Sequence, residues 1–262
     1  MSTFYRSIKL KQKNPFGGNY FFFPEINSTN TYIKENLSLF DDGDLIWSHH
    51  QSSGRGRSGR SWKSNDNGNL YFTLLIKGKP WDEKARNISQ TIATGLCLTL
   101  QKYISATRIK WPNDLLIGNS KIAGILTEAI PNKEKVDILV GVGVNLRSDH
   151  HFLKDIDREA TSLFDQLTNR WIPTPSRFLS QFCSFTGSLL ADLMGTDGFS
   201  TIFPIWKNNC LPPGTEIYYH SRPEGNYGLK TSATIIDYLP SGEIVLESGG
   251  QQKVISSGEL TL

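Results

Sequence analysis

Three consecutive segments of strand-forming residues constrain the fold more than any other feature of the sequence. They are "TRIKW" (107–111), "KIAGILTEAI" (121–130) and "VDILVGVGVNL" (136–146), with the turn signals Pro112-Asn113-Asp114 and Pro131-Asn132 between them. Two further strand segments, 44–50 and 69–77, precede them. Because sequential strands usually lie next to one another, these segments predict a mixed or antiparallel sheet.

Segments with helical periodicity alternate with the strands, so the predicted fold class is α+β. The first of them begins at "STN" (28–30), where Ser28 or Thr29 can cap the helix. The shortest is expected to bend near Pro204. The predicted helical segments are 26–37, 82–104, 175–194 and 199–211.

The pattern changes after "LPPG" (211–214), where short alternating strands begin. Four strands are predicted, at 215–220, 229–239, 243–247 and 252–256, with Ser241-Gly242 and Gly249-Gly250 as turns. We therefore expect a main domain over 1–210 and a small β-barrel over 211–262. A chain of about 50 residues forms a marginal core, so the barrel should pack on the main domain.

The composition excludes several classes of protein. A formal net charge of +3 over 262 residues is low for a dedicated nucleic-acid-binding protein, so no specific DNA binding is expected. Cys97, Cys183 and Cys210 are too widely spaced for a disulfide framework, which predicts buried thiols and a cytoplasmic location. No apolar run approaches the roughly 20 residues of a membrane helix. The basic start (1–14) fits a lead-in to a strand or a transit peptide.

The segment "GRGRSGRSW" (54–62) concentrates three arginines on a glycine-rich stretch. Glycines let backbone N–H groups approach an anion, and guanidinium groups match phosphate oxygens in pairs. No Gly-Lys-Ser/Thr follows, so the segment is not the usual NTPase phosphate loop. It predicts a phosphate-binding loop, with a solvated basic loop and an RNA-binding arginine-glycine element as alternatives.

Two further motifs contain polar residues that can meet at a pocket. "KWPNDLL" (110–116) places Lys110, Asn113 and Asp114 at a strand end and a tight turn, although such a sequence also forms plain turns. In "KIAGILTE" (121–128), Gly124 leaves room for a ligand. Lys121 is the lysine of this strand, and a single lysine in a strand is also compatible with an exposed position outside any site. Strict alternation in this motif predicts one face shared by Lys121, Ala123, Ile125 and Thr127.

In order and spacing these motifs resemble those of the biotin protein ligases. The resemblance rests on "STN", Gln51, "GRGRSGRSW", "GNLY" (68–71), "KWPNDLL", "KIAGILTE" and "GVGVNL" (141–146), and covers about residues 25–150. The segment after "LPPG" resembles the small SH3-like barrel of that family. Because fewer than 30 residues precede the core, the chain resembles the monofunctional type without a DNA-binding domain.

The resemblance implies an ATP-dependent ligase that converts biotin to biotinyl-5′-AMP and transfers biotin to a lysine of a biotin carboxyl carrier protein. The implied catalytic residues are Lys121, Arg57, Lys110 and Asp114. The implied biotin-binding residues are Ser28, Thr29, Asn30, Gln51, Gly54, Arg55, Arg57, Tyr71, Lys121 and Gly124. The implied nucleotide-binding residues are Arg55, Arg57, Arg60, Trp62, Asn113, Lys121 and Asn145.

The same resemblance implies biotin and ATP with Mg²⁺ as substrates, and no bound prosthetic group. No acidic pair or histidine cluster stands out, so no dedicated metal site is expected. A monomer or weak homodimer is expected. Lipoate–protein ligases, which share the core fold and the adenylate chemistry, are the alternative, although the arginine and "KWPND" motifs favour biotin. Asp114 could act on the acceptor amine or hold Lys121.

Overall fold

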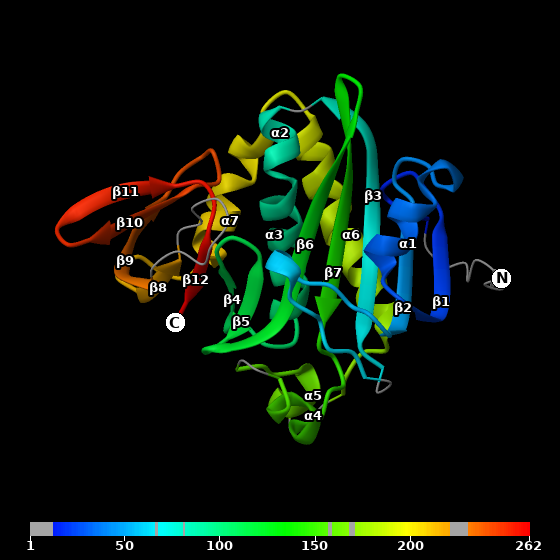
Figure 1. Cartoon of the computed structure of the whole chain (residues 1–262), viewed down its shortest axis with the longest axis horizontal. Coiled ribbons are helices and arrows are strands. Elements are labelled where there is room, and N and C mark those ends of the chain that lie inside the picture. The colour runs from blue at the N-terminus through cyan, green and yellow to red at the C-terminus, as the bar shows by residue number, and fades with distance from the viewer. Residues whose placement is uncertain (1–12, 66–67, 81, 157–158, 168–170, 221–229) are drawn as a thin grey trace.

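The computed structural model of the chain describes residues 13–65, 68–80, 82–156, 159–167, 171–220 and 230–262. The predicted lead-in or transit segment lies mostly outside these residues. A seven-stranded sheet forms the centre of the molecule, in the order β1-β2-β3-β7-β6-β5-β4 (Figure 1). Among the described strands of this sheet, β1 and β2 are the only neighbours that pair in parallel, which confirms a mixed, largely antiparallel sheet. Its strands are β1 (Tyr20–Ile26), β2 (Leu45–Gln51), β3 (Leu70–Pro80), β4 (Thr107–Lys110), β5 (Asp114–Ile117), β6 (Ser120–Asn132) and β7 (Lys135–Val144).

Helices cover both faces of this sheet, which confirms the α+β class. The long helices α3 (Ile88–Gln101) and α6 (Pro175–Met194) pack against each other and contribute to the main apolar cluster. The short α1 (Thr29–Glu35), capped by the Ser28 side chain, packs with β2, β3 and β7 in a second cluster. The remaining helices are α2 (Glu83–Arg86), α4 (His150–Lys154), α5 (Leu163–Gln166) and α7 (Phe203–Asn209).

Alternation along β7 explains why the sequence reads "VGVGV". Val140, Val142 and Val144 are buried in the main cluster with α3 and α6. Gly141 and Gly143 therefore point to the opposite face, where a Cβ would come within 2.2 Å of Asn30 and 2.6 Å of Trp62, respectively. The glycines thus let α1 and the 54–62 loop lie directly on the sheet.

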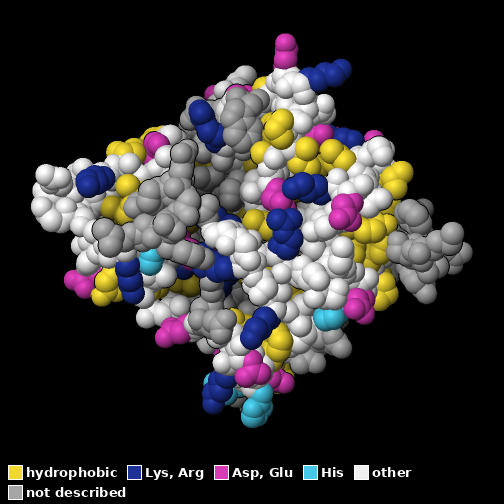
Figure 2. Space-filling view, viewed as in Figure 1, with side chains coloured by type: hydrophobic (Ala, Val, Ile, Leu, Met, Phe, Trp, Pro, Cys, Tyr) yellow, Lys and Arg dark blue, Asp and Glu magenta, His cyan; other side chains and the backbone are white. Residues whose placement is uncertain are grey.

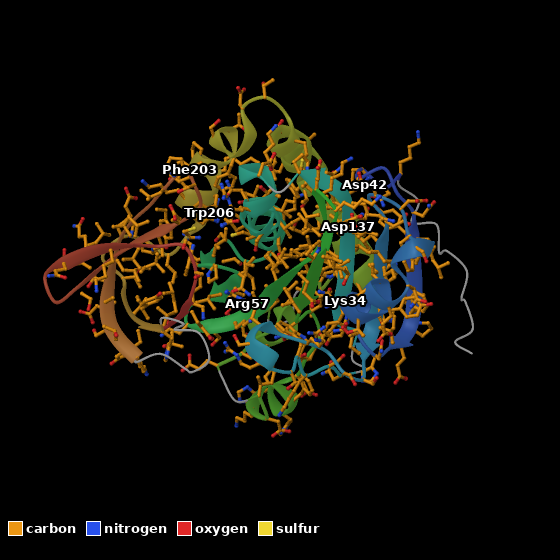
Figure 3. All side chains as sticks on the ribbon, turned by 45° about the horizontal axis from the view of Figure 1, so that its top comes forward. Lys34, Asp42, Arg57, Asp137, Phe203 and Trp206 are labelled. Atoms are coloured by element: carbon orange, nitrogen blue, oxygen red, sulfur yellow. The ribbon has the colours of Figure 1, made fainter. Side chains whose placement is uncertain are left out.

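The C-terminal strands form a second, antiparallel sheet in the order β11-β10-β9-β8-β12, consistent with a small SH3-like barrel. Trp206 of α7, labelled in Figure 3, contacts Tyr238 with ring centroids 5.3 Å apart. Trp111 Nε1 donates to Gly242 O at 3.0 Å, and one apolar cluster runs through both sheets. The strands are β8 (Glu216–His220), β9 (Lys230–Tyr238), β10 (Ile244–Ser248), β11 (Gln251–Ile255) and β12 (Glu259–Thr261).

Several sequence predictions need correction. The helix predicted over 82–104 is two helices, because Asn87 leaves the helical conformation with φ −89° and ψ 5°. Pro131-Asn132 is not a turn but the end of β6, and the reversal comes at Lys133 with φ 55°. Since β5 pairs with β6 only up to Gly124, Pro131 lies where β6 has one partner, and proline is tolerated there. Strands β5 and β12 were not predicted, and for β1 only the lead-in over 1–14 was.

Candidate active site

A buried carboxylate between two lysines lies at the start of β5. Asp114 Oδ1 is 2.5 Å from Lys121 Nζ, and Asp114 Oδ2 is 3.2 Å from Lys110 Nζ. Burial raises the pKa of Asp114, but the two ammonium charges and their hydrogen bonds outweigh this and lower it to about 2. At neutral pH the group is therefore a carboxylate that fixes both lysines, and it is a weak base.

A β-bulge places Lys121 in this cluster and contradicts the predicted face. The register between β5 and β6 shifts between Leu115 and Leu116, because Leu115 pairs with Ala123 and Leu116 pairs with Lys121. Both Ile122 and Ala123 are consequently buried in the main cluster. Lys121 shares a face with Gly124 instead, since a Cβ on Gly124 would lie 2.7 Å from Lys121 Nζ. Lys121 is therefore on the face opposite Ala123 and Ile125.

The arginines of the 54–62 loop contact three different parts of the molecule. Arg55 Nη1 lies 3.3 Å from Glu128 of β6, which also lies 3.6 Å from Lys34 of α1. Arg57 Nη1 donates to Asn113 Oδ1 at 2.9 Å. Arg60 forms an ion pair with Glu259 of β12. In Figure 3 Arg57 lies over the middle of the molecule, between the C-terminal sheet and α1.

Trp62, at the end of the loop, covers the glycines of β6 and β7. Its ring atoms would lie 2.6 Å from a Cβ on Gly143 and 2.9 Å from one on Gly124. Lys121 Nζ stands 5.2 Å from the centroid of the same ring, in a cation–π contact. The ring and the ammonium group therefore occupy the space that the small residues provide.

Beneath the loop is a narrow cavity of about 50 Å³ that we call the glycine cavity. Its wall contains a hydrogen-bond network in which Gln51 Oε1 accepts from Thr29 N at 2.8 Å, and Thr73 Oγ1 donates to Asn30 Oδ1 at 2.5 Å. The volume is below the roughly 300–1,000 Å³ of typical small-molecule sites, because Trp62 and Lys121 fill part of it. Among its lining residues are Ser28, Thr29, Asn30, Gln51, Arg55, Arg57, Trp62, Asn113, Lys121, Gly124, Gly141 and Gly143.

A larger cavity of about 350 Å³ adjoins it, and we call it the arginine cavity. Five basic and two acidic side chains line it, which makes it suitable for a polyanion. Figure 2 shows basic side chains at the hollow between the two sheets. Among its lining residues are Arg57, Arg60, Trp62, Lys63, Lys110, Asn113, Asp114, Lys121, Asn145 and Glu259. Arg57, Trp62, Asn113 and Lys121 line both cavities.

Three of the predicted site residues do not line the cavity expected for them. Tyr71 is fully buried and accepts a hydrogen bond from Asn69 Nδ2 at 3.2 Å, so it lies behind the cavity wall and not in it. Gly54 acts through its backbone, since its carbonyl accepts from Trp62 N at 2.8 Å. Arg55, predicted for both substrates, lines the glycine cavity but not the arginine cavity.

Sequence reasoning missed Glu128 and Glu259, the carboxylates that hold the loop. Their partners Arg55 and Arg60 lie 73 and 199 residues away in the sequence, so no local signal links them. Gly141 and Gly143 were also missed as wall residues, although the "VGVGV" alternation could have indicated them. Thr73, which binds Asn30 from behind the wall, was missed as well.

Two features are absent from the part of the chain that the structure describes. No group of three or more His, Cys, Asp or Glu side chains in this part of the chain could hold a metal ion. No helix among the described residues is long and apolar enough to cross a membrane.

Comparison with known proteins assigns the central part of the chain to a family. Residues 22–145 match the Biotin/lipoate A/B protein ligase family, so this segment is a domain of that family. The fold is similar to that of a solved biotin protein ligase from Aquifex aeolicus in complex with biotin and ATP. The TM-score is 0.74 and the identity 22%, over 93% of this chain and 97% of that one.

Curated relatives agree with this assignment. The Bifunctional ligase/repressor BirA of Escherichia coli is 33% identical over 132 residues, which are 50% of this chain and 41% of that protein. A Biotin--[acetyl-CoA-carboxylase] ligase of Mycobacterium tuberculosis is 23% identical over 84% of this chain and 79% of that protein. The match thus spans about two fifths of the length of the Escherichia coli relative.

Proposed function

We propose that the protein is a biotin protein ligase, which activates biotin with ATP to biotinyl-5′-AMP and transfers biotin to a lysine of a carboxyl carrier protein. The observation that carries this proposal is the pair of adjoining cavities that share Lys121, Arg57 and Asn113. A condensation between a carboxylic acid and a nucleotide needs two such compartments that meet at a cationic centre. The names of the relatives and the biotin and ATP of the Aquifex aeolicus complex supply the substrates.

The glycine cavity is assigned to biotin and the arginine cavity to ATP with its magnesium ion. Gly124, Gly141 and Gly143 allow a bicyclic ring to lie against the sheet, and Gln51 and Asn30 provide polar groups in the wall. Because Trp62 and Lys121 partly fill this cavity, biotin displaces them when it enters. The arginines of the loop match the phosphates, and Trp62 can stack on the adenine.

In the adenylation step, the biotin carboxylate attacks the α-phosphate, and two anions must approach each other. Lys121 lies at the junction of the cavities, where its ammonium group neutralises charge on the reacting oxygens. Asp114, with a pKa of about 2, holds Lys121 and Lys110 in place rather than removing a proton. Of the two roles left open by the sequence, this geometry supports the one of holding Lys121.

The proposal includes a carboxyl-carrier partner, a cytoplasmic location, a monomer or weak homodimer, and domains over 1–210 and 211–262. None of these four features is needed for the adenylation step at Lys121. Lipoate remains the alternative acid, because the matched family contains ligases for both acids.

Exchange of labelled pyrophosphate into ATP tests the proposal. The protein alone, with biotin, and with lipoate are compared at equal concentrations. Exchange that depends on biotin and is at least 100-fold weaker with lipoate is the expected result, since a site shaped for one ring rejects another. Exchange with lipoate alone would make the protein a lipoate ligase. Exchange with neither acid would refute adenylation.

A further inference from the structure

A third cavity reaches the same lysine pair from the side of the chain's C-terminus. It has a volume of about 370 Å³, and we call it the C-terminal cavity. Lys110, Asp114 and Lys121 lie where it meets the arginine cavity, and Lys121 also borders the glycine cavity. Its other walls include Asn119 of the β5–β6 turn, Glu159, and Leu262 at the end of the chain.

The three cavities therefore meet at Lys121, although two substrates account for only two of them. The C-terminal cavity shares only Lys121 with the glycine cavity, so it does not extend the proposed biotin site. The C-terminal cavity shares Lys110, Asp114 and Lys121 with the arginine cavity. A group inside the C-terminal cavity therefore has access to the centre where the adenylate is formed. This is the position that a second, incoming reactant requires.

Three basic and three acidic side chains line this cavity, and the acidic Glu159 is the one that could meet a cation at the rim. Glu159 is exposed, and the segment that carries it is fixed against the lysine, because its carbonyl accepts from Lys121 N at 3.0 Å. Thr161 N donates in turn to Lys121 O at 2.9 Å, so the backbone on both sides of Ala160 is hydrogen-bonded to that of Lys121. Glu259 of β12 also lines the cavity, where it pairs with Arg60.

We infer that the C-terminal cavity is the entrance for the acceptor lysine of the carrier protein, and that Glu159 attracts its ammonium group at the rim. The inference rests on the proposed function. In the transfer step the lysine nitrogen forms an amide bond with the biotin carboxyl carbon, and the bond from that carbon to the phosphate oxygen breaks. AMP leaves with the electron pair, and the nitrogen releases two protons to solvent on going from ammonium to amide.

Two variants test the entrance without touching the adenylation centre. Glu159→Lys reverses the charge at the rim, and Asn119→Trp adds bulk at an exposed turn of the same cavity. Glu134, an exposed residue of the β6–β7 turn that lines none of the three cavities, supplies the matched controls Glu134→Lys and Glu134→Trp.

Each variant is assayed for biotin-dependent pyrophosphate exchange, for transfer to an apo carboxyl carrier domain, and for transfer to hydroxylamine. We expect Glu159→Lys to raise the KM for the carrier roughly 3- to 30-fold, an effect that shrinks at high salt, because rim charges act through screened attraction. Asn119→Trp should slow transfer to the carrier at any salt concentration. Exchange, hydroxamate formation and both control variants should match wild type.

The outcomes separate the entrance from the proposed function. If wild type shows no biotin-dependent exchange, the proposed function is refuted, and the inference about the entrance is refuted with it. If exchange is intact and both cavity variants biotinylate the carrier like their Glu134 controls, the acceptor enters elsewhere and only the entrance is refuted. Exchange that falls in parallel with transfer also overturns the inference, since it would assign the cavity to pyrophosphate or ATP.

Discussion

Replacing Asp114 with asparagine removes the charge between two lysines and leaves the shape of the side chain nearly unchanged. The side chains of Asp114, Lys110 and Lys121 are only 10%, 13% and 14% exposed, so solvent screens their interaction weakly. The asparagine variant resembles the protonated acid. The difference in the free energy of unfolding between wild type and the variant therefore measures what the negative charge contributes to folding.

The magnitude follows from the pKa of Asp114, which is lowered from 3.8 to about 2 in the folded chain. A lowered pKa stabilises the fold at pH values above the unfolded pKa, and this stabilisation is lost as the pH falls through the folded pKa. This lowering of the pKa corresponds to roughly 2 to 3 kcal/mol of stability at pH 7, and to about half of that at pH 3. Asp114→Asn should therefore cost roughly 2 to 3 kcal/mol at neutral pH and progressively less in acid.

Urea unfolding of wild type and Asp114→Asn between pH 7 and pH 3 measures this difference. The same comparison in a Lys121→Gln background is the control, because removal of one lysine weakens the coupling and should reduce the loss. A loss that stays constant with pH, or that is unchanged by Lys121→Gln, would refute the account of the cluster as a charge-stabilised triad.

Three other predictions concern the site, and a fourth concerns binding to DNA. Lys121→Ala should reduce biotinyl-5′-AMP formation by roughly two to three orders of magnitude in a quenched single-turnover assay, the effect of losing one preorganised donor; near-normal formation would remove Lys121 from the mechanism. Arg57→Gly should lose a charge-assisted contact of about 1.5–3 kcal/mol and release the adenylate about 10- to 150-fold faster. Rapid filtration would detect the released adenylate, and a blot would detect the biotin that it attaches to bystander proteins. Tight retention without bystander labelling would limit Arg57 to ATP binding. Biotin should change the tryptophan fluorescence of wild type but not of Trp62→Phe, because the ring over Gly143 must move; an equal change in both would place biotin elsewhere. With a net charge of only +3, the protein should give no footprint on DNA at physiological salt with competitor present, and a persistent footprint would contradict this.

Local patterns in the sequence were sufficient for most of the elements. The helix over 175–194 has the bounds predicted from its periodicity, and Gly242, Gly249 and Gly250 have the positive φ values that the predicted turns require. The three thiols are buried as predicted. Errors occurred where the outcome depends on a neighbouring strand, as at Pro131, since a strand end is set by the length of its partner and not by its own residues.

The site was predictable to the extent that it rests on short motifs. "GRGRSGRSW", "KWPNDLL" and "KIAGILTE" supply most of the residues that line the two proposed substrate cavities. The role of the carboxylates that hold the loop could not be predicted, because Glu128, although it ends "KIAGILTE", and Glu259 lie 73 and 199 residues from the arginines that they bind. An ion pair between residues far apart in the chain produces no periodic or local pattern in the sequence.

The bulge beside Lys121 shows why alternation fails at this particular position. A regular strand would put Lys121 on the face of Ala123 and Ile125, within the apolar cluster under α3, where an unpaired ammonium group is too costly to bury. One extra residue on β6 moves the lysine to the opposite face, where Asp114 is 2.5 Å away. The same shift lets the backbone of Lys121 pair with Ala160, which brings Glu159 to the rim of the C-terminal cavity. A single irregularity in the sheet therefore places the lysine in its charge cluster and positions the segment proposed to receive the acceptor.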